Sequence, residues 1–420
     1  MRSLQTIPNK RRLVLAACLL GLVSGLAGIL LHYLLELVEG LAFGRSEHQS
    51  GFLTDGVAPS RIWLSLFLVG FSSALVWYLL QRKGNILSVK GQMKEESSHH
   101  RLHFWKQLLH STWQIIAVGA GAPVGKEGAP REIGALLAPP LVRALDLSFQ
   151  DRMFLIACGA GAGLAAVYQV PLTSVFFIFE TLGLAFSMKR FVLAGITTYV
   201  AAYTAGWVIS DRALYQVSEI TWSPTVLWQM LIGIVILTPV AWLFARFTKK
   251  ASIYRIKDKR ILITLPLAFV FLAGLASFQP HLLGNGRMMA QEILNGATWQ
   301  TILLLFSLKA LVVLLTFWAG AYGGTLTPSF ALGMAGAALI SLVLGFGNAP
   351  AFLLLGSVIF LTVTLKAPLS ATGLVLGFTG QGLTALPYLL LTAFLTVGFS
   401  KGLDHLMGKK IKESPVYKIQ

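Results

Sequence analysis

The sequence predicts an all-α integral membrane protein, a polytopic bundle of two inverted repeats with broken, tilted helices. Of its 420 residues, 55% are hydrophobic and 12% are charged, whereas about a quarter of the residues in soluble domains are charged. Apolar runs long enough to span a bilayer recur along the chain, and two pairs of motifs repeat at nearly the same separation. These three observations predict the fold class.

The apolar runs locate the expected spanning helices, each of which needs roughly 20 apolar residues. The first run, 13–43, is about twice as long as the apolar core of a signal peptide and has no small-residue cleavage site, so we expect a retained, tilted helix. The other clear runs are 62–80, 153–187, 191–210, 226–247, 261–278 and 301–320.

The net charge of +17 comes from Lys and Arg that gather in loops and tails. The basic segments are 1–12, 82–106, 246–260 and 401–418. The positive-inside rule places them in the cytoplasm, and both termini with them. The segments 45–61 and 211–223 are poorer in basic residues and are expected outside the plasma membrane. The basic residues therefore predict topology, and no nucleic-acid partner is expected.

The sequence indicates neither a metal site nor a disulfide framework. Cys18 and Cys158 both lie in apolar runs, so neither a disulfide framework nor a thiolate metal site is expected. His99, His100 and His103 have ligand-like spacing, but they stand in a charged loop without a cysteine or carboxylate cage. No metal or cofactor is expected. Without paired carboxylates or a nucleophile with its base inside the apolar runs, no enzyme is expected either.

Two pairs of motifs indicate an internal repeat. The segment 125–130, GKEGAP, is echoed by 323–328, GGTLTP, and the prolines of the pair are 198 residues apart. The segment 170–174, VPLTS, is echoed by 367–371, APLSA, with prolines 197 residues apart. Two matches at nearly one offset predict two structural repeats.

The repeats set the expected domain boundaries. The first transmembrane repeat is predicted at 13–210 and the second at 226–402, between cytoplasmic tails at 1–12 and 403–420. Basic segments at both ends imply an even number of crossings, and an odd number in each half fits an inverted arrangement. The short second tail predicts no C-terminal regulatory domain.

The stretch 119–134, GAGAPVGKEGAPREIG, places Lys126, Glu127, Arg131 and Glu132 in apolar sequence. A charged side chain at membrane depth costs at least about 2.5–3.5 kcal/mol, so such charges usually mark a function. Arg131 and Glu132 are expected to form a pair that holds the broken helix.

The interrupted segments around Pro130 and Pro328 are typical of broken helices whose starts meet near the membrane midplane. A helix start presents unpaired N–H groups and about half a positive charge, which attract anions. Lys126 adds to this field. Glu127 is a carboxylate in the place of the anion, so it can occupy the site and leave it when protonated. A phosphate loop is excluded because Glu127 stands where its Ser or Thr belongs.

These motifs resemble those of the CLC family of chloride channels and chloride/proton antiporters. Residues 125–129, GKEGA, are similar to the family pattern Gly-(Arg/Lys)-Glu-Gly-Pro, with Ala129 replacing the proline. Residues 324–328, GTLTP, are similar to Gly-x-Phe-x-Pro, with Leu326 replacing the phenylalanine. A glycine-rich block at 159–166 also matches. The resemblance covers about 13–405 and is to a divergent prokaryotic-type member without C-terminal regulatory domains.

The resemblance implies a homodimer with one pore in each subunit and assigns roles to particular residues. Glu127 is the gating and proton-transfer residue. The implied internal proton path is Glu180 and Thr181, although Thr181 replaces the second glutamate of many antiporters. The first anion motif of the family is represented by 83–87, KGNIL, which lacks the usual serine. The implied anion-binding residues are Lys126, Gly128, Thr325, Leu326, Thr327, Gly84, Asn85 and Tyr417.

The expected function is transport of chloride or a similar small anion across the lipid bilayer. The sequence leaves open whether protons are exchanged for the anion or whether the protein is a passive channel. A fluoride exporter of the same family is the alternative, because the serine is missing and Asn85 and Thr327 are present. A membrane-embedded enzyme that uses Glu127 and histidines is disfavoured.

Overall fold

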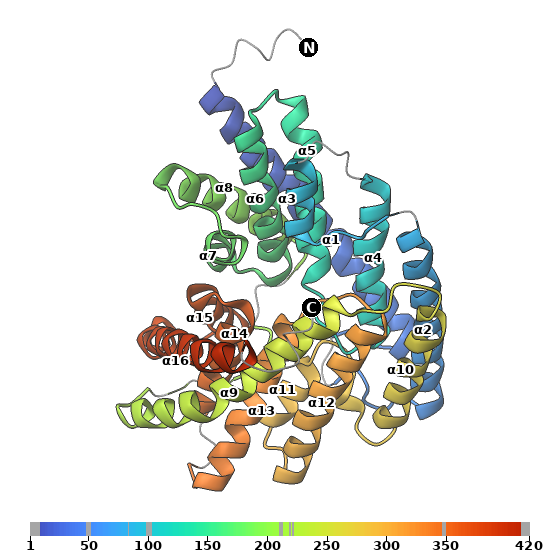
Figure 1. Ribbon diagram of the computed structural model, residues 1–420, viewed down its shortest axis with the longest axis vertical. Coiled ribbons are helices and arrows are strands. Elements are labelled where there is room, and N and C mark those ends of the chain that lie inside the picture. Colours follow the sequence, from blue (N-terminus) through green and yellow to red (C-terminus); the bar gives the residue numbers. More distant parts are fainter. Residues whose placement is uncertain are drawn as a thin grey trace.

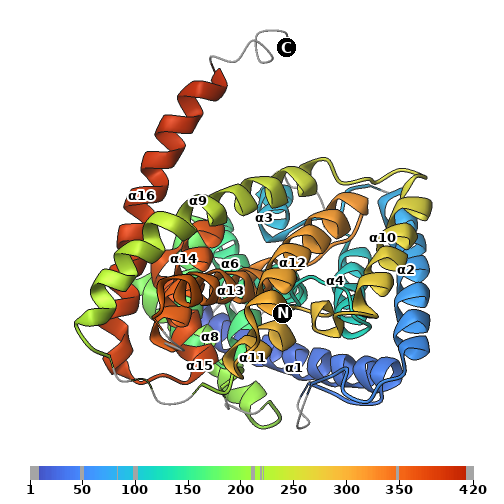
Figure 2. The same ribbon diagram turned by 90° about the horizontal axis from the view of Figure 1, so that it is seen from below.

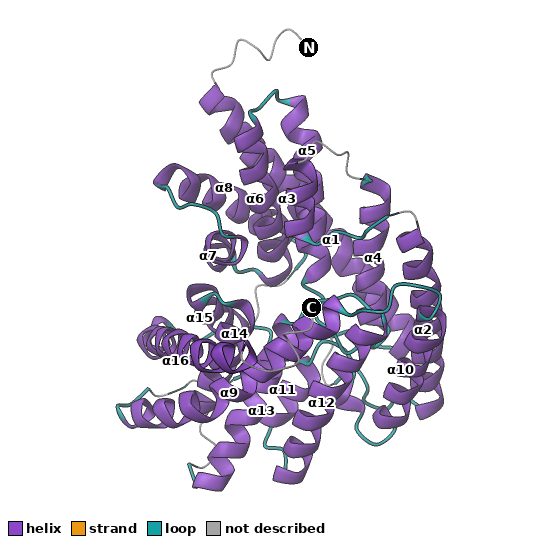
Figure 3. Cartoon of the chain, viewed as in Figure 1, coloured by secondary structure: helices purple, strands orange, loops and turns teal. Residues whose placement is uncertain are grey.

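The computed structural model describes residues 9–47, 52–82, 84–97, 103–209, 213–217, 220, 222–346 and 350–412. The described residues form α-helices, two short 3-10 helices and the loops between them (Figure 3). The first eight α-helices are α1 Asn9–Phe43, α2 Pro59–Arg82, α3 Val89–Ser97, α4 Phe104–Gly119, α5 Gly128–Ala144, α6 Phe149–Tyr168, α7 Pro171–Leu182 and α8 Met188–Gly206. The others are α9 Thr225–Ile253, α10 Ile261–Ala276, α11 Arg287–Leu294, α12 Trp299–Ala319, α13 Leu326–Leu344, α14 Pro350–Leu365, α15 Pro368–Thr379 and α16 Leu386–Lys412, with the 3-10 helices η2 Pro280–Leu282 and η3 Leu383–Ala385.

The predicted all-α membrane fold is confirmed. Within the described ranges, seven helices are long and apolar enough to cross a membrane, and four shorter apolar helices accompany them. Large apolar side chains that remain exposed, such as Leu30, Leu41 and Leu267, lie on these helices. An exposed apolar belt of this kind is what a bilayer would cover.

The two halves of the chain form two groups of helices (Figure 1). Helices α3, α5, α6, α7 and α8 gather in the upper part of this view, and α9 and α11–α16 in the lower part. The halves meet where α2 packs on α10 and where α7 packs on α15. Seen from below, α16 extends away from the rest of the bundle (Figure 2). The contacts of α2 with α10 and of α7 with α15 therefore join helices that hold corresponding positions in the two halves.

Helix crossings repeat between the halves. A Cβ atom on Gly134 of α5 would overlap the carbonyl of Gly159 on α6, and one on Gly333 of α13 would overlap the carbonyl of Gly356 on α14. Both crossings need glycine because the two backbones touch. Equivalent close crossings at equivalent positions support the predicted repeats, whose boundaries stay a prediction.

The second pair of echoed motifs starts a short helix in each half. Helices α7 and α15 have 12 residues each and begin at Pro171 and Pro368, where the missing N–H of proline costs nothing. Both end at a left-handed glycine, Gly183 with φ 72° and Gly380 with φ 61°. The two motifs are therefore similar because each one begins a short helix at the corresponding position of its half.

The crossing of α5 and α6 is expected to tolerate no side chain at Gly163. In Gly163→Ala the new Cβ would overlap the backbone carbonyl of Pro130. We therefore expect the free energy of unfolding to fall by about 3 kcal/mol, near the upper end for overpacking. The matched control is Gly195→Ala on α8, where nothing lies within 4 Å. Thermal unfolding in detergent measures both variants; equal melting temperatures would contradict the tight crossing.

Candidate anion site

The two glycine-rich motifs meet directly. The Gly125 N–H donates to the carbonyl of Gly324, and the Gly324 N–H donates to the carbonyl of Gly125, both at 2.8 Å. This pair of hydrogen bonds joins the loop before α5 to the loop before α13. The starts of two helices from different halves are thereby held side by side, as the motif repeat predicts.

The Glu127 carboxylate lies at the start of α13. The side chain is fully buried. Its Oε1 accepts a hydrogen bond of 2.6 Å from the Leu326 N–H, and its Oε2 lies 3.4 Å from the Thr327 Oγ1 donor. Thr325 is the residue that precedes the helix. The structure thus brings Glu127 together with two of the predicted anion-binding residues, Leu326 and Thr327.

Glycines form the walls around this carboxylate. A Cβ atom on Gly324 would overlap Glu127 Oε1, and one on Gly125 would overlap Oε2. A Cβ on Gly128 would lie 2.5 Å from the Gln114 Oε1 atom. These glycines let a small anionic group approach the backbone closely.

The basic residues close to Glu127 in the sequence form hydrogen bonds with groups other than its carboxylate. The Lys126 Nζ atom donates to Glu47 Oε2 at 2.7 Å, and Arg287 Nη1 lies 3.6 Å from the same oxygen. Arg131 Nε donates to the backbone carbonyl of Glu127 at 2.7 Å. The Glu127 carboxylate is therefore held by neutral donors. The anion-binding role of Lys126 stays a prediction.

The ion pair of Lys126 with Glu47 is expected to stabilise the loop before α5. Their side chains are 7% and 9% exposed, and removing one partner of a buried pair costs about 3–5 kcal/mol. We therefore expect Lys126→Met to lower the free energy of unfolding by about this amount. The double variant with Glu47→Gln should recover part of the loss. Thermal unfolding of the single and double variants measures this, and equal losses in both would contradict the coupling.

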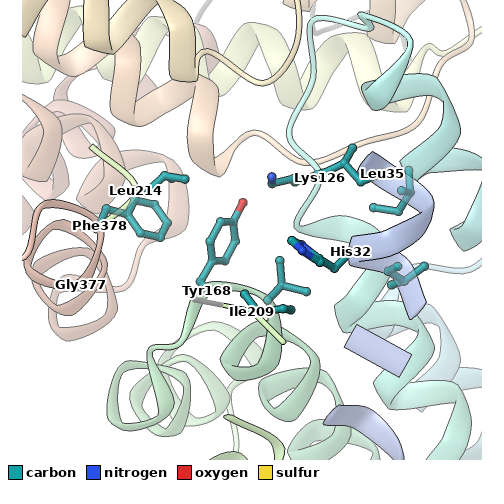
Figure 4. Close-up of a pocket in the computed structure, with 11 residues that line it drawn as sticks. His32, Leu35, Lys126, Tyr168, Ile209, Leu214, Gly377 and Phe378 are labelled. Atoms are coloured by element: carbon teal, nitrogen blue, oxygen red, sulfur yellow. The ribbon is translucent and has the colours of Figure 1, made fainter. Parts of the chain in front are cut away.

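A cavity opens beside Lys126. His32 of α1 and Tyr168 at the end of α6 line it with Lys126, and the Tyr168 hydroxyl points into it (Figure 4). Leu214 and Phe378 line the opposite side. The cavity thus lies beside the residue that precedes Glu127, with polar atoms from Lys126, His32 and Tyr168 among an otherwise apolar lining.

Two tyrosines near the site were not predicted. Tyr168 packs on Phe378, with ring centroids 4.8 Å apart, and Tyr215 stacks on Phe330 of α13 at 4.5 Å. Among the described residues, both hydroxyls are buried without a hydrogen-bond partner. Burial raises the pKa of Tyr215 and Arg287 opposes the rise, so its hydroxyl keeps its proton as a donor. The predicted Tyr417 lies outside the described residues. Tyr168 closely follows the glycine-rich block at 159–166, and that position is the signal that could have identified it.

The other predicted anion residues lie apart from the buried carboxylate. Gly84 and Asn85 are exposed in the loop before α3, and the Gly84 carbonyl accepts from Lys106 Nζ at 2.6 Å. The structure does not bring this loop to Glu127, and its predicted anion-binding role stays untested.

Glu180, at the end of α7, caps the start of α15. Its carboxylate accepts from the N–H groups of Leu369 and Ser370 at 3.0 and 2.8 Å and from Ser370 Oγ at 2.7 Å. The side chain therefore joins the two halves. Thr181 follows it, with a hydroxyl that is buried and without a partner among the described residues. Their predicted place on a proton path remains a prediction.

The expected pair of Arg131 with Glu132 is wrong. Arg131 lies over the Phe177 ring at 5.4 Å besides holding the Glu127 carbonyl. Glu132 Oε2 instead accepts from Gln114 Nε2 at 2.7 Å and from Ser111 Oγ at 3.0 Å. Arg131 and Glu132 thus contact different residues and do not pair with each other.

The fold and site define a polytopic helical membrane protein in which two broken-helix starts enclose a buried carboxylate. The chain belongs to the voltage gated chloride channel family, whose sequence model matches residues 69–401.

Relatives and solved structures agree with this membership. The chain is 24% identical to the voltage-gated ClC-type chloride channel ClcB of Salmonella typhi, over 94% of this chain and 97% of that one. It is 25% identical to the H(+)/Cl(-) exchange transporter ClcA of Cronobacter sakazakii, over 90% and 84%. A slow cyanobacterial Cl-/H+ antiporter has the same fold, with a TM-score of 0.81, 20% identity and coverage of 93% and 95%. A CLC-type fluoride/proton antiporter follows with a TM-score of 0.66, 17% identity and the same coverage.

Proposed function

We propose that the protein carries chloride or a similar small anion across the membrane, through the site at the starts of α5 and α13, with Glu127 as the gate. One observation supports this most directly: a buried carboxylate is held by a backbone N–H and near a hydroxyl, while Lys126 and Arg131 bind elsewhere. A site of neutral donors at a helix start suits a mobile anion. Protonation removes the charge of Glu127 and releases it, so an anion can take its place.

Family membership supports anion transport and leaves its mode open. The relatives carry the names of a channel, ClcB, and of an exchange transporter, ClcA. We favour exchange, because a gate that binds a proton each time it leaves the site can carry that proton.

Purified protein in liposomes tests the proposal. We expect chloride efflux under a chloride gradient, together with proton movement against its own gradient, read with a pH-sensitive dye. Chloride efflux without uphill proton movement would identify a passive channel. No anion flux of any kind would overturn anion transport.

Fluoride export is the second candidate, and the Thr327 hydroxyl beside Glu127 is the observation that favours it. Fluoride accepts strong hydrogen bonds, so a hydroxyl donor at the site would favour it over chloride. Fluoride and chloride efflux from the same liposomes separate the two functions. Faster fluoride efflux at equal gradients would make fluoride the substrate.

We also propose a homodimer in the plasma membrane with both termini in the cytoplasm. The site is built from residues of one chain, which supports a separate pathway in each subunit. Cross-linking in the membrane and protease accessibility of terminal tags test assembly and orientation.

A further inference from the structure

A second buried carboxylate lies close to Glu127, in a polar cluster between α4 and α5. The Glu132 side chain is 13% exposed, and His110, on α4, is fully buried. Gln114 Nε2 lies 2.7 Å from Glu132 Oε2 and 2.9 Å from His110 Nε2. His110 Nε2 lies 3.3 Å from the same Glu132 oxygen. Three polar atoms thus form a closed triangle inside the protein.

The hydrogens of this triangle leave room for one more proton. The amide nitrogen of Gln114 has two hydrogens, one for Glu132 and one for His110. The role of His110 Nε2 depends on the tautomer: as N–H it donates to the Glu132 oxygen, and without its hydrogen it accepts from Gln114. In the second arrangement the His110–Glu132 edge joins two acceptors, and a proton bound to the Glu132 oxygen can lie on that edge. The cluster therefore has a place for a proton between Glu132 and His110.

The cluster reaches the residue next to Glu127. A Cβ on Gly128 would lie 2.5 Å from Gln114 Oε1, so the Gln114 amide lies between the start of α5 and Glu132. Glu127 directly precedes α5 and Glu132 lies on its second turn, so both carboxylates belong to the same end of this helix.

The cluster also lies toward the side expected to be cytoplasmic. Helix α5 runs from Glu127 to an end where Arg12 Nη1, from the basic N-terminal segment, donates to the Leu145 carbonyl at 3.3 Å. The backbone carbonyl of Glu132 accepts from Gln92 of α3, and α3 belongs to the basic segment 82–106. Lys126 and Glu47 lie on the opposite side, in and beside a loop expected to be outside.

The charged surroundings of Glu132 come from the loops around α10 and α13. Tyr322 presents its ring edge-on to His110 at 4.7 Å between centroids. The Arg255 guanidinium lies 3.8 Å from the Tyr322 ring centroid and interacts electrostatically with Glu132. Ser111 donates to the carboxylate from α4. One cation, one tyrosine and one histidine therefore act on this carboxylate.

We propose that Glu132, together with His110, is the internal proton donor of Glu127, an inference that rests on the proposed exchange function. In the transfer, the O–H bond of the Glu132 carboxyl group breaks and an O–H bond forms on the Glu127 carboxylate, through water beside Gln114. Glu132 then takes a new proton from the cytoplasmic solution. This route needs no carboxylate at Thr181, and it leaves Glu180 to its three hydrogen bonds at the start of α15.

The test uses the full chain in liposomes with a chloride gradient and a pH-sensitive dye. In Glu132→Gln we expect the protons moved per chloride to fall at least about a hundredfold, the lower range for a lost acid–base group, while chloride efflux continues. Glu132→Asp keeps a protonatable group and should restore coupling. Because Glu132→Gln can also weaken the fold, His110→Gln is the second variant and should lower coupling with the carboxylate in place. Glu180→Gln tests the competing route, and the matched control is Glu292→Gln on α11, which pairs with His281 and should keep the ratio of the native protein.

The outcomes separate this relay from the proposed function. An unchanged ratio in both Glu132→Gln and His110→Gln, or a loss in Glu180→Gln alone, would overturn the relay and leave exchange standing. Native protein that moves chloride without uphill protons would overturn the relay and leave anion transport standing. Native protein without any anion flux would overturn both.

Discussion

Glu127→Gln is expected to keep anion movement and to abolish its dependence on pH and its coupling to protons. Glutamine has nearly the shape of glutamate, so its amide oxygen can accept from the Leu326 N–H as Glu127 Oε1 does. It carries no negative charge and no exchangeable acidic proton, so it cannot compete with the anion as a charge or deliver a proton. We expect proton flux to fall at least about a hundredfold, the lower range for a lost acid–base group.

Chloride efflux and proton uptake across a range of pH measure this variant against the native protein. The matched control is Glu292→Gln on α11, a partly buried glutamate that pairs with His281 and that should leave both fluxes unchanged. Complete loss of anion movement in correctly folded Glu127→Gln would contradict the gate, because a gate that cannot close should still let the ion pass.

The place of the site could be predicted from the sequence because the repeat fixes two points of it. The 125–130 and 323–328 segments start helices at equivalent positions, and related halves bring such starts together. The hydrogen bonds between Gly125 and Gly324 span 199 residues, a contact that local sequence patterns cannot predict. The repeat of the 125–130 motif at 323–328 is what indicated that these two segments meet, and the small size of glycine lets their backbones come close enough to bond.

The direction of the side chains could not be predicted in the same way. Lys126 adjoins Glu127 in sequence, which suggested that both act on the anion, but Glu47 lies 79 residues earlier and binds its ammonium group. Arg131 and Glu132 are consecutive on α5, and consecutive residues of a helix point in different directions. This geometry explains why the expected pair is wrong and why each residue finds a partner on a different element.

Gly324→Ala is expected to expel the Glu127 carboxylate from the start of α13. The three atoms nearest to the new Cβ would be Oε1, Cδ and Cγ of Glu127. The backbone of Gly324 is held by its two hydrogen bonds to Gly125, so the side chain is the part that must move. We expect anion flux to continue with weaker dependence on pH, as in Glu127→Gln. The matched control is Gly274→Ala on α10, where nothing lies within 4 Å of the new Cβ.

A double variant separates expulsion of the carboxylate from damage to the anion site itself. Glu127→Ala removes all three atoms that the Gly324→Ala side chain would meet. If the methyl group acts only through them, Glu127→Ala combined with Gly324→Ala should have the anion flux of Glu127→Ala alone, the non-additivity expected for residues in contact. A further large loss of flux in the double variant would contradict this. The methyl group would then occupy space that the anion itself needs, and the carboxylate and the anion would use the same glycine-walled position in turn.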